Sequence, residues 1–123
     1  MAPAAGRSQA RPRHSEPRSA ILVLTTVPER AGAEALAREL LAARLAACIQ
    51  IGGAVQSLYH WRGQIETASE IPLAIKTRAV LYPRVEAAIR GRHPYELPEI
   101  VVVPISDGLP DYLDWIDAET AAR

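Results

Sequence analysis

The side chains that could support metal binding or nucleophilic catalysis are few: Cys48 and the histidines His14, His60 and His93. A single cysteine excludes an internal disulfide, a Cys-x-x-Cys redox motif and a Cys-rich zinc site. It also fits a reducing compartment. Because Cys48 opens an apolar segment, we interpret it as a small buried side chain and not as a nucleophile. No motif pairs a nucleophile with a base, so we predict no catalytic residue and no enzymatic activity.

His93 is the candidate metal ligand among the histidines. It follows a predicted helix C-terminus, where a positive charge is stabilised, so helix-end electrostatics and a ligand or acid–base role both stay open. His60 alternates with Tyr59 and Trp61 in a predicted hairpin, which favours a surface or interface role. Lys76 is the only lysine among 14 basic side chains, and we expect it to pair with a carboxylate or with an anionic ligand.

The apolar periodicity of the chain predicts the elements that position these residues. Apolar, β-branched runs predict strands over residues 20–27, 47–51 continuing at 55–61, 64–77 and 99–105. Apolar residues at helical spacing predict helices over residues 28–46, 78–92 and 111–120. The order β-α-β-β-α-β with a C-terminal helix is the split βαβ arrangement, so we predict an α+β, ferredoxin-like domain.

Residues 55–72 form a predicted hairpin that is longer than such a fold requires. Its two-residue turn, Arg62-Gly63, sets a register in which Tyr59 faces Glu66. Exposed aromatic side chains near the end of this extended hairpin would reduce the solubility of a monomer. We therefore expect the hairpin to pack on other subunits.

The length of 123 residues fits one domain, residues 20–123, behind a tail of residues 1–19. The tail has three prolines, four arginines and no aromatic residue, so we predict that it is disordered. Its four arginines and one glutamate give +3, which leaves −3 for the domain because the net charge of the chain is zero. A domain of −3 disfavours nucleic acid as a partner. No apolar run approaches the ~20 residues that span a bilayer and no secretory signal is recognisable, so we expect a cytoplasmic protein without a membrane partner.

Several separated motifs give the sequence a resemblance to a known family. They are LAACI at 45–49, SLYHWRGQI at 57–65, Glu70, IKT at 75–77, HPYELPEI at 93–100, Asp107-Gly108 and YLDWI at 112–116. Together they run from about residue 21 to residue 115, nearly the whole chain outside the tail. This pattern resembles the CutA family, also called the divalent-cation tolerance proteins.

The resemblance implies a small cytoplasmic homotrimer with a ferredoxin-like protomer, similar in architecture to the PII signalling proteins. It also implies a link to the tolerance of copper and other divalent metals. Some family members carry a cysteine where this chain has Thr25, and two adjacent histidines where it has Arg92 and His93. Because only His93 of that metal site is retained, we expect any Cu²⁺ binding through it to be weak.

In a PII-like trimer we expect a cleft between subunits that takes a small polar ligand. Converging strand ends would bring together Lys76, His93, Tyr95 and Glu99, and the neighbouring hairpin would add Tyr59 and Trp61. An ion-pair network at the interface is the alternative interpretation of these residues. For the whole protein, metal or small-ligand signalling stands beside a trimeric structural scaffold without a ligand.

Overall fold

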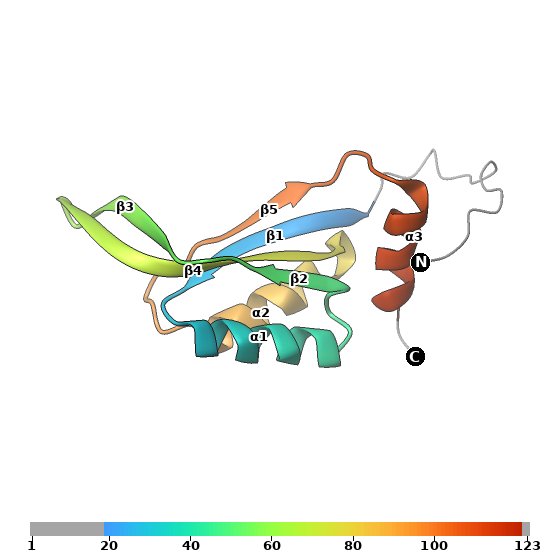
Figure 1. Ribbon diagram of the computed structural model, residues 1–123, viewed down its shortest axis with the longest axis horizontal. Coiled ribbons are helices and arrows are strands. Elements are labelled where there is room, and N and C mark those ends of the chain that lie inside the picture. The colour runs from blue at the N-terminus through green and yellow to red at the C-terminus, as the bar shows by residue number, and fades with distance from the viewer. Residues whose placement is uncertain (1–18, 122–123) are drawn as a thin grey trace.

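The computed structural model describes residues 19–121, so the predicted tail lies outside the described part of the chain except for its last residue. The elements along this part (Figure 1) are β1 (Ala20–Val27), α1 (Arg30–Ala42), β2 (Cys48–Ile51), β3 (Val55–Trp61), β4 (Gln64–Arg78), α2 (Tyr82–Arg92), β5 (Ile100–Pro104) and α3 (Pro110–Glu119). A 3-10 turn, η3 (Ala79–Leu81), joins β4 to α2. The predicted α+β class and the predicted order of elements are confirmed.

The strands pair antiparallel in the order β2-β4-β1-β5, and β3 pairs with the other half of β4. β1 lies between β4 and β5, which is the strand order of a ferredoxin-like sheet. The register of the hairpin is the predicted one, because Tyr59 pairs with Glu66 and Trp61 with Gln64.

A break at Gly52 divides the predicted second strand into β2 and β3. The Gly52 N–H donates to the Pro72 carbonyl at 2.9 Å. Since the N and O atoms of one strand residue point to the same edge, the Pro72 nitrogen, which has no hydrogen, also faces this break. Proline is tolerated in β4 because no ladder bond is required there. A Cβ atom on Gly52 would lie 3.0 Å from the Pro72 Cγ atom, so the close approach favours glycine.

Helix α1 is shorter than predicted at both ends. Glu29 has an extended backbone, with φ −139° and ψ 147°, so the first helical residue is Arg30. At the other end the chain turns through Arg44, whose φ of 58° is left-handed, and the Leu45 N–H bonds to the Leu40 carbonyl at 2.9 Å. The prediction of a helix over 28–46 was too long because alanines continue the apolar spacing beyond this left-handed turn.

Helices α1 and α2 cover one face of the sheet, and the main core lies between these layers (Figure 1). Its largest fully buried apolar side chains are Val23, Leu36, Leu40, Leu73, Ile75, Val85 and Ile89. Helix α3 lies at the end of the sheet, where Leu113 and Ile116 pack on Ala20. None of the helices within residues 19–121 is long and apolar enough to cross a membrane.

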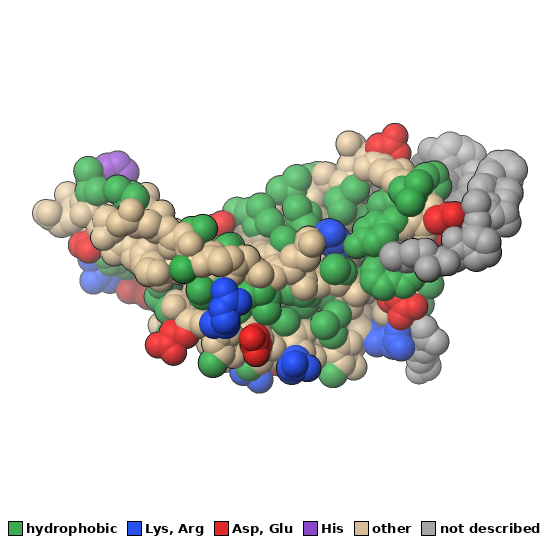
Figure 2. Space-filling model, in the orientation of Figure 1, with side chains coloured by type: hydrophobic (Ala, Val, Ile, Leu, Met, Phe, Trp, Pro, Cys, Tyr) green, Lys and Arg blue, Asp and Glu red, His purple; other side chains and the backbone are tan. Residues whose placement is uncertain are grey.

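The opposite face of the sheet is not covered by α1 or α2 (Figure 1). We call it the open face and define it by the residues that alternate with the core residues of β1, β4 and β5: Leu22, Leu24, Ala74, Lys76, Val101 and Val103. Val101 and Val103 are 45% and 43% exposed. Figure 2 shows hydrophobic side chains gathered over β1, β5 and α3. The open face is therefore largely apolar, whereas a solvated face of an antiparallel sheet is usually polar.

Truncation of Ile75 to alanine is expected to lower the free energy of unfolding by about 2–5 kcal/mol, because the side chain is fully buried in the central strand β4. The control is Val80→Ala in η3, where the side chain is 68% exposed and the change should stay within about 0.5 kcal/mol. Urea unfolding measures both values. Equal effects of the two substitutions would contradict the placement of the core.

Candidate functional site

A buried carboxylate, Glu70, lies where the hairpin leaves the sheet. Glu70 is only 6% exposed. The Ser57 hydroxyl donates to its Oε1 atom at 2.7 Å, and the Tyr95 phenol forms a second hydrogen bond with it. A buried carboxylate is costly unless donors satisfy its oxygens. Glu70 therefore ties the hairpin to the segment that follows α2, residues 93–99, which we call the loop 93–99.

The pKa of the Tyr95 phenol is raised above its ordinary value of 10.0. The largest cause is burial, followed by the hydrogen bond to Glu70 and the negative charge of Glu70, with a smaller contribution from Tyr59. The phenol consequently stays neutral, and remains a hydrogen-bond donor to Glu70, to higher pH than a solvated tyrosine.

Both ring nitrogens of His93 have partners. The Tyr95 N–H donates to Nδ1 at 3.1 Å, and Nε2 lies 2.7 Å from the Thr26 carbonyl oxygen. Since Nδ1 accepts, Nε2 must carry the proton that it donates to the carbonyl, which is one of the two neutral tautomers. The His93 and Tyr95 ring centroids are 4.7 Å apart. In this arrangement His93 orders the loop 93–99, and a metal ion would have to displace one of these bonds.

The end of the hairpin contacts the same loop. Arg62, with φ 52°, and Gly63, with φ 81°, form its turn, and both left-handed values are typical of a type I′ turn. The Arg62 guanidinium lies 2.9 Å from Glu96 and 5.1 Å from the centroid of the Trp61 ring. Tyr59 is 41% exposed. The aromatic residues of the hairpin and the loop 93–99 thus form one region of the protomer.

Lys76 does not belong to this region. Its Nζ atom lies 3.4 Å from the Tyr112 hydroxyl and 5.4 Å from the centroid of the Tyr112 ring, beside α3. Along β4 it is four residues from Pro72, which is about 13 Å at the rise of a strand. Pro72 is the register partner of Thr26, whose carbonyl binds His93. The prediction that Lys76 converges with Tyr95 and Glu99 is therefore wrong within one protomer, because β4 carries Lys76 to the opposite end of the sheet.

Glu99 reaches the region through its backbone. The Thr25 hydroxyl donates to the Glu99 carbonyl at 2.7 Å, and the Glu99 side chain itself is exposed. Arg92 forms an ion pair with Glu39 of α1. Thr25 and Arg92, which stand where the family resemblance implied metal ligands in some members, are thus used here for contacts within the protomer.

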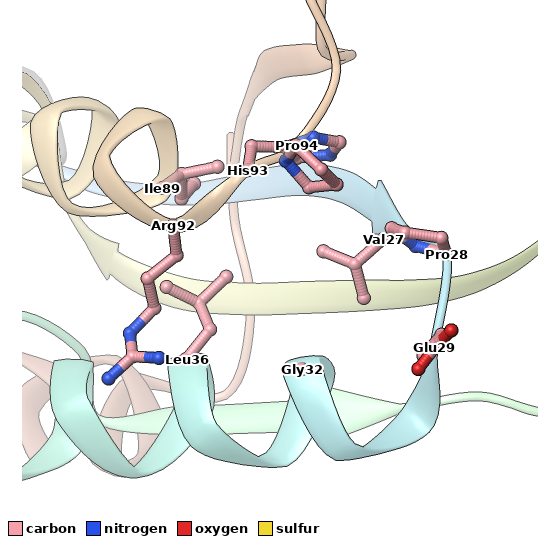
Figure 3. Close-up of a pocket in the computed structure, with 9 residues that line it drawn as sticks. All are labelled: Val27, Pro28, Glu29, Gly32, Leu36, Ile89, Arg92, His93 and Pro94. Atoms are coloured by element: carbon pink, nitrogen blue, oxygen red, sulfur yellow. The ribbon is translucent and has the colours of Figure 1, made fainter.

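Residues 19–121 contain no group of three or more His, Cys, Asp or Glu side chains that could hold a metal ion. A cavity of about 290 Å³ lies between α1 and α2, and its lining includes Arg92 and His93 (Figure 3). Sequence reasoning missed this cavity, and it did not identify Ser57 and Tyr95 as the partners of Glu70. The hairpin register held a signal for Glu70, since it places Glu70 opposite Val55 and on the same face as Ser57.

Comparisons with known proteins identify relatives over most of the chain. A family model described as CutA1 divalent ion tolerance protein matches residues 21–119. The divalent-cation tolerance protein CutA of Thermus thermophilus is 38% identical over 99 residues, which cover 80% of this chain and 96% of that protein. The crystal structure of CutA1 from Shewanella sp. SIB1 has a TM-score of 0.82 at 39% identity, covering 86% of this chain and 99% of that one. CutA from Xylella fastidiosa has a TM-score of 0.81 at 42% identity, covering 84% and 99%.

Replacement of Glu70 by glutamine is expected to lower the pKa of Tyr95 toward 10.0, because it removes the charge that opposes ionisation of the phenol. The raised pKa means that the folded protein holds this proton more tightly than the unfolded chain. Its contribution to stability is complete below about pH 10 and is lost as the pH rises through the folded pKa. Absorbance of the phenolate during an alkaline titration measures the shift, and Tyr95→Phe identifies the signal.

The matched control for this titration is Glu86→Gln. Burial raises the pKa of Tyr82, and the hydrogen bond to Glu86 and its charge raise it further, whereas Glu86 does not contribute to the raised pKa of Tyr95. The Glu86→Gln substitution should therefore lower the pKa of Tyr82 and leave the pKa of Tyr95 unchanged. If the pKa of Tyr95 is the same in the wild-type protein and in the Glu70→Gln variant, the hydrogen bond between Tyr95 and Glu70 is contradicted.

Proposed function

Because the chain belongs to the CutA1 divalent ion tolerance protein family, we propose that it acts in the tolerance of divalent cations as a homotrimer. The observation that carries the assembly is the apolar open face. Leu22, Leu24, Val101 and Val103 lie on the side of the sheet that α1 and α2 leave uncovered. A contiguous apolar surface of this kind on a soluble protein marks an interaction site. Copies of the same chain are the partner that the proposal assigns to it.

The outer edge of β5 supports the same proposal. β5 pairs with β1 alone among the described strands, so one edge of its backbone is free within the protomer. Val101, Val102 and Val103 are 45%, 39% and 43% exposed along it. A flat apolar edge strand is prone to pair with another chain unless it is covered. Assembly through the open face and this edge would bury both.

The hairpin gives the assembly its second surface. β3 and the first half of β4 extend beyond the four-stranded part of the sheet, and Leu58 and Ile65 are 64% and 70% exposed there. Contact between the hairpin of one copy and the open face of the next joins two different surfaces. Such an interface closes into a ring when repeated rotation from one copy to the next returns to the first copy. The family resemblance sets the proposed size of that ring at three.

The proposed ligand cleft lies where the hairpin of one copy meets the loop 93–99 of another. Tyr59, Trp61, Tyr95 and Glu99 supply aromatic walls and one exposed carboxylate. That mixture suits a small polar ligand or a divalent cation such as Cu²⁺. The scaffold without a ligand remains the second candidate, because the polar groups of this region already have partners within the protomer. The Glu70 carboxylate accepts from Ser57, and both ring nitrogens of His93 are hydrogen-bonded.

The purified protein is expected to contain three copies of the chain at micromolar concentration, as measured by native mass spectrometry and light scattering. Val103→Asp should dissociate the assembly, since it would bury an unpaired carboxylate in the apolar interface. Val80→Asp in η3, where the side chain is 68% exposed, is the control and should leave the assembly intact. A monomeric wild-type protein would overturn the proposal.

Cu²⁺ is expected to quench the fluorescence of Trp61 in a saturable manner and with weak affinity. The Trp115→Phe background makes Trp61 the only tryptophan of the chain. Glu99→Gln should weaken the quenching, and Glu34→Gln on the exposed side of α1 should not. If quenching does not saturate and native mass spectra show no retained small molecule, the scaffold is favoured and the ligand cleft is rejected.

A further inference from the structure

The cavity between α1 and α2 has an apolar floor. Val27 at the end of β1, Leu36 of α1 and Ile89 of α2 line it, and none of the three is more than 6% exposed. Figure 3 shows Val27 and Leu36 between Glu29 on one side and Arg92 on the other. Its volume of about 290 Å³ is near the lower limit of the ~300–1,000 Å³ that is usual for ligand pockets. Only a small ligand fits.

Gly32 in the first turn of α1 keeps this cavity open. No atom lies within 4 Å of the position that its Cβ would occupy, and its φ is not left-handed. Alanine would fit there and would stabilise the helix by about 1 kcal/mol. Packing and backbone geometry within the protomer therefore do not require a glycine. What the absent side chain provides is space above the apolar floor, since Gly32 lines the cavity.

The charge at the cavity is negative. Arg92 is neutralised by its ion pair with Glu39. The Glu29 carboxylate forms no hydrogen bond or ion pair with any residue of the described part of the chain. The N-terminus of α1 favours an anion, and Glu29, which precedes the first helical residue, already supplies one. His93 contributes only its ring, because both of its nitrogens are bonded.

We propose that this cavity binds a small organic ammonium ion with an unbranched apolar chain. The ammonium group lies beside Glu29, and the chain lies over Gly32 against Val27 and Leu36. A hydrated metal cation would gain nothing from an apolar floor, and a carboxylate would be repelled by Glu29. The proposal is independent of the cleft between subunits, because all of its residues belong to one protomer.

Three six-carbon probes of the same length separate charge from apolar contact: hexylammonium, hexanol and hexanoate. Each is titrated into the intact wild-type protein, and binding is followed by the NMR shifts of the Val27 and Leu36 methyl groups. Hexylammonium should bind about five-fold more tightly than hexanol, which is the size expected for a solvent-exposed ion pair. Hexanoate should bind more weakly than hexanol. Equal affinities, or a preference for hexanoate, would overturn the proposal.

Two variants locate the site. Glu29→Gln should remove the preference for hexylammonium over hexanol, whereas Glu34→Gln, an exposed residue of α1 that does not line the cavity, should keep it. Gly32→Leu should block all three probes and raise the melting temperature, because leucine is a better helix former. Undiminished hexylammonium binding by Gly32→Leu would place the site elsewhere. If that variant does not fold, the comparison of Glu29→Gln with Glu34→Gln decides alone.

Discussion

Hydrogen bonding along both edges of β4 is the constraint on which the rest of the structure depends. This strand of 15 residues pairs with β1 on one edge, and with β2 and then β3 on the other. Its second half lies in the middle of the sheet, where Leu73 and Ile75 are fully buried. Its first half leaves the sheet as one side of the hairpin. Because one continuous strand serves both parts, the direction of the hairpin is fixed by the sheet.

The change of partner from β2 to β3 occurs at Gly52 and Pro72, and both residues are suited to it. Proline has no N–H to donate at the break, and glycine has no side chain to collide with the proline ring. Beyond this point Ser57 and Glu70 face the loop 93–99, and Arg62 reaches Glu96. The polar contacts of the candidate site therefore follow from a break in the backbone pairing, and they hold the hairpin against its own protomer.

The polar region around His93 and Glu70 fixes the conformation of the protomer, whereas the apolar open face is available for assembly. Around His93 and Glu70 the hydrogen-bonding groups are satisfied internally, which favours one geometry of the loop 93–99. On the open face the apolar side chains have no partner layer, and burial of such area contributes roughly 25 cal/mol per Å². The proposed assembly draws its free energy from the open face. The candidate cleft then depends on how the satisfied region of one copy meets the hairpin of the next.

The sequence by itself determined the local features of this protein. The apolar run that forms β1, the two-residue turn at Arg62-Gly63 and the register between Tyr59 and Glu66 were all predictable, because they depend on sterics and hydrogen bonds between residues close in the chain. The family resemblance also followed from motifs that can be read directly. The end of α1 was not predictable from apolar spacing, since the left-handed turn at Arg44 interrupts a run rich in alanine.

Only the tertiary structure decided which distant side chains meet. Lys76 was expected to pair with a carboxylate or an anionic ligand, yet it reaches Tyr112 of α3, and the carboxylate of Glu70 on the same strand reaches Tyr95. The cavity beside Gly32 likewise depends on the approach of α2 to α1. These contacts depend on the strand order of the sheet and on helix packing. Both result from many weak interactions between residues that are far apart in the chain. No pattern of neighbouring residues encodes such long-range interactions. The sequence therefore determined the helices and strands, and the tertiary structure determined which of their side chains come into contact.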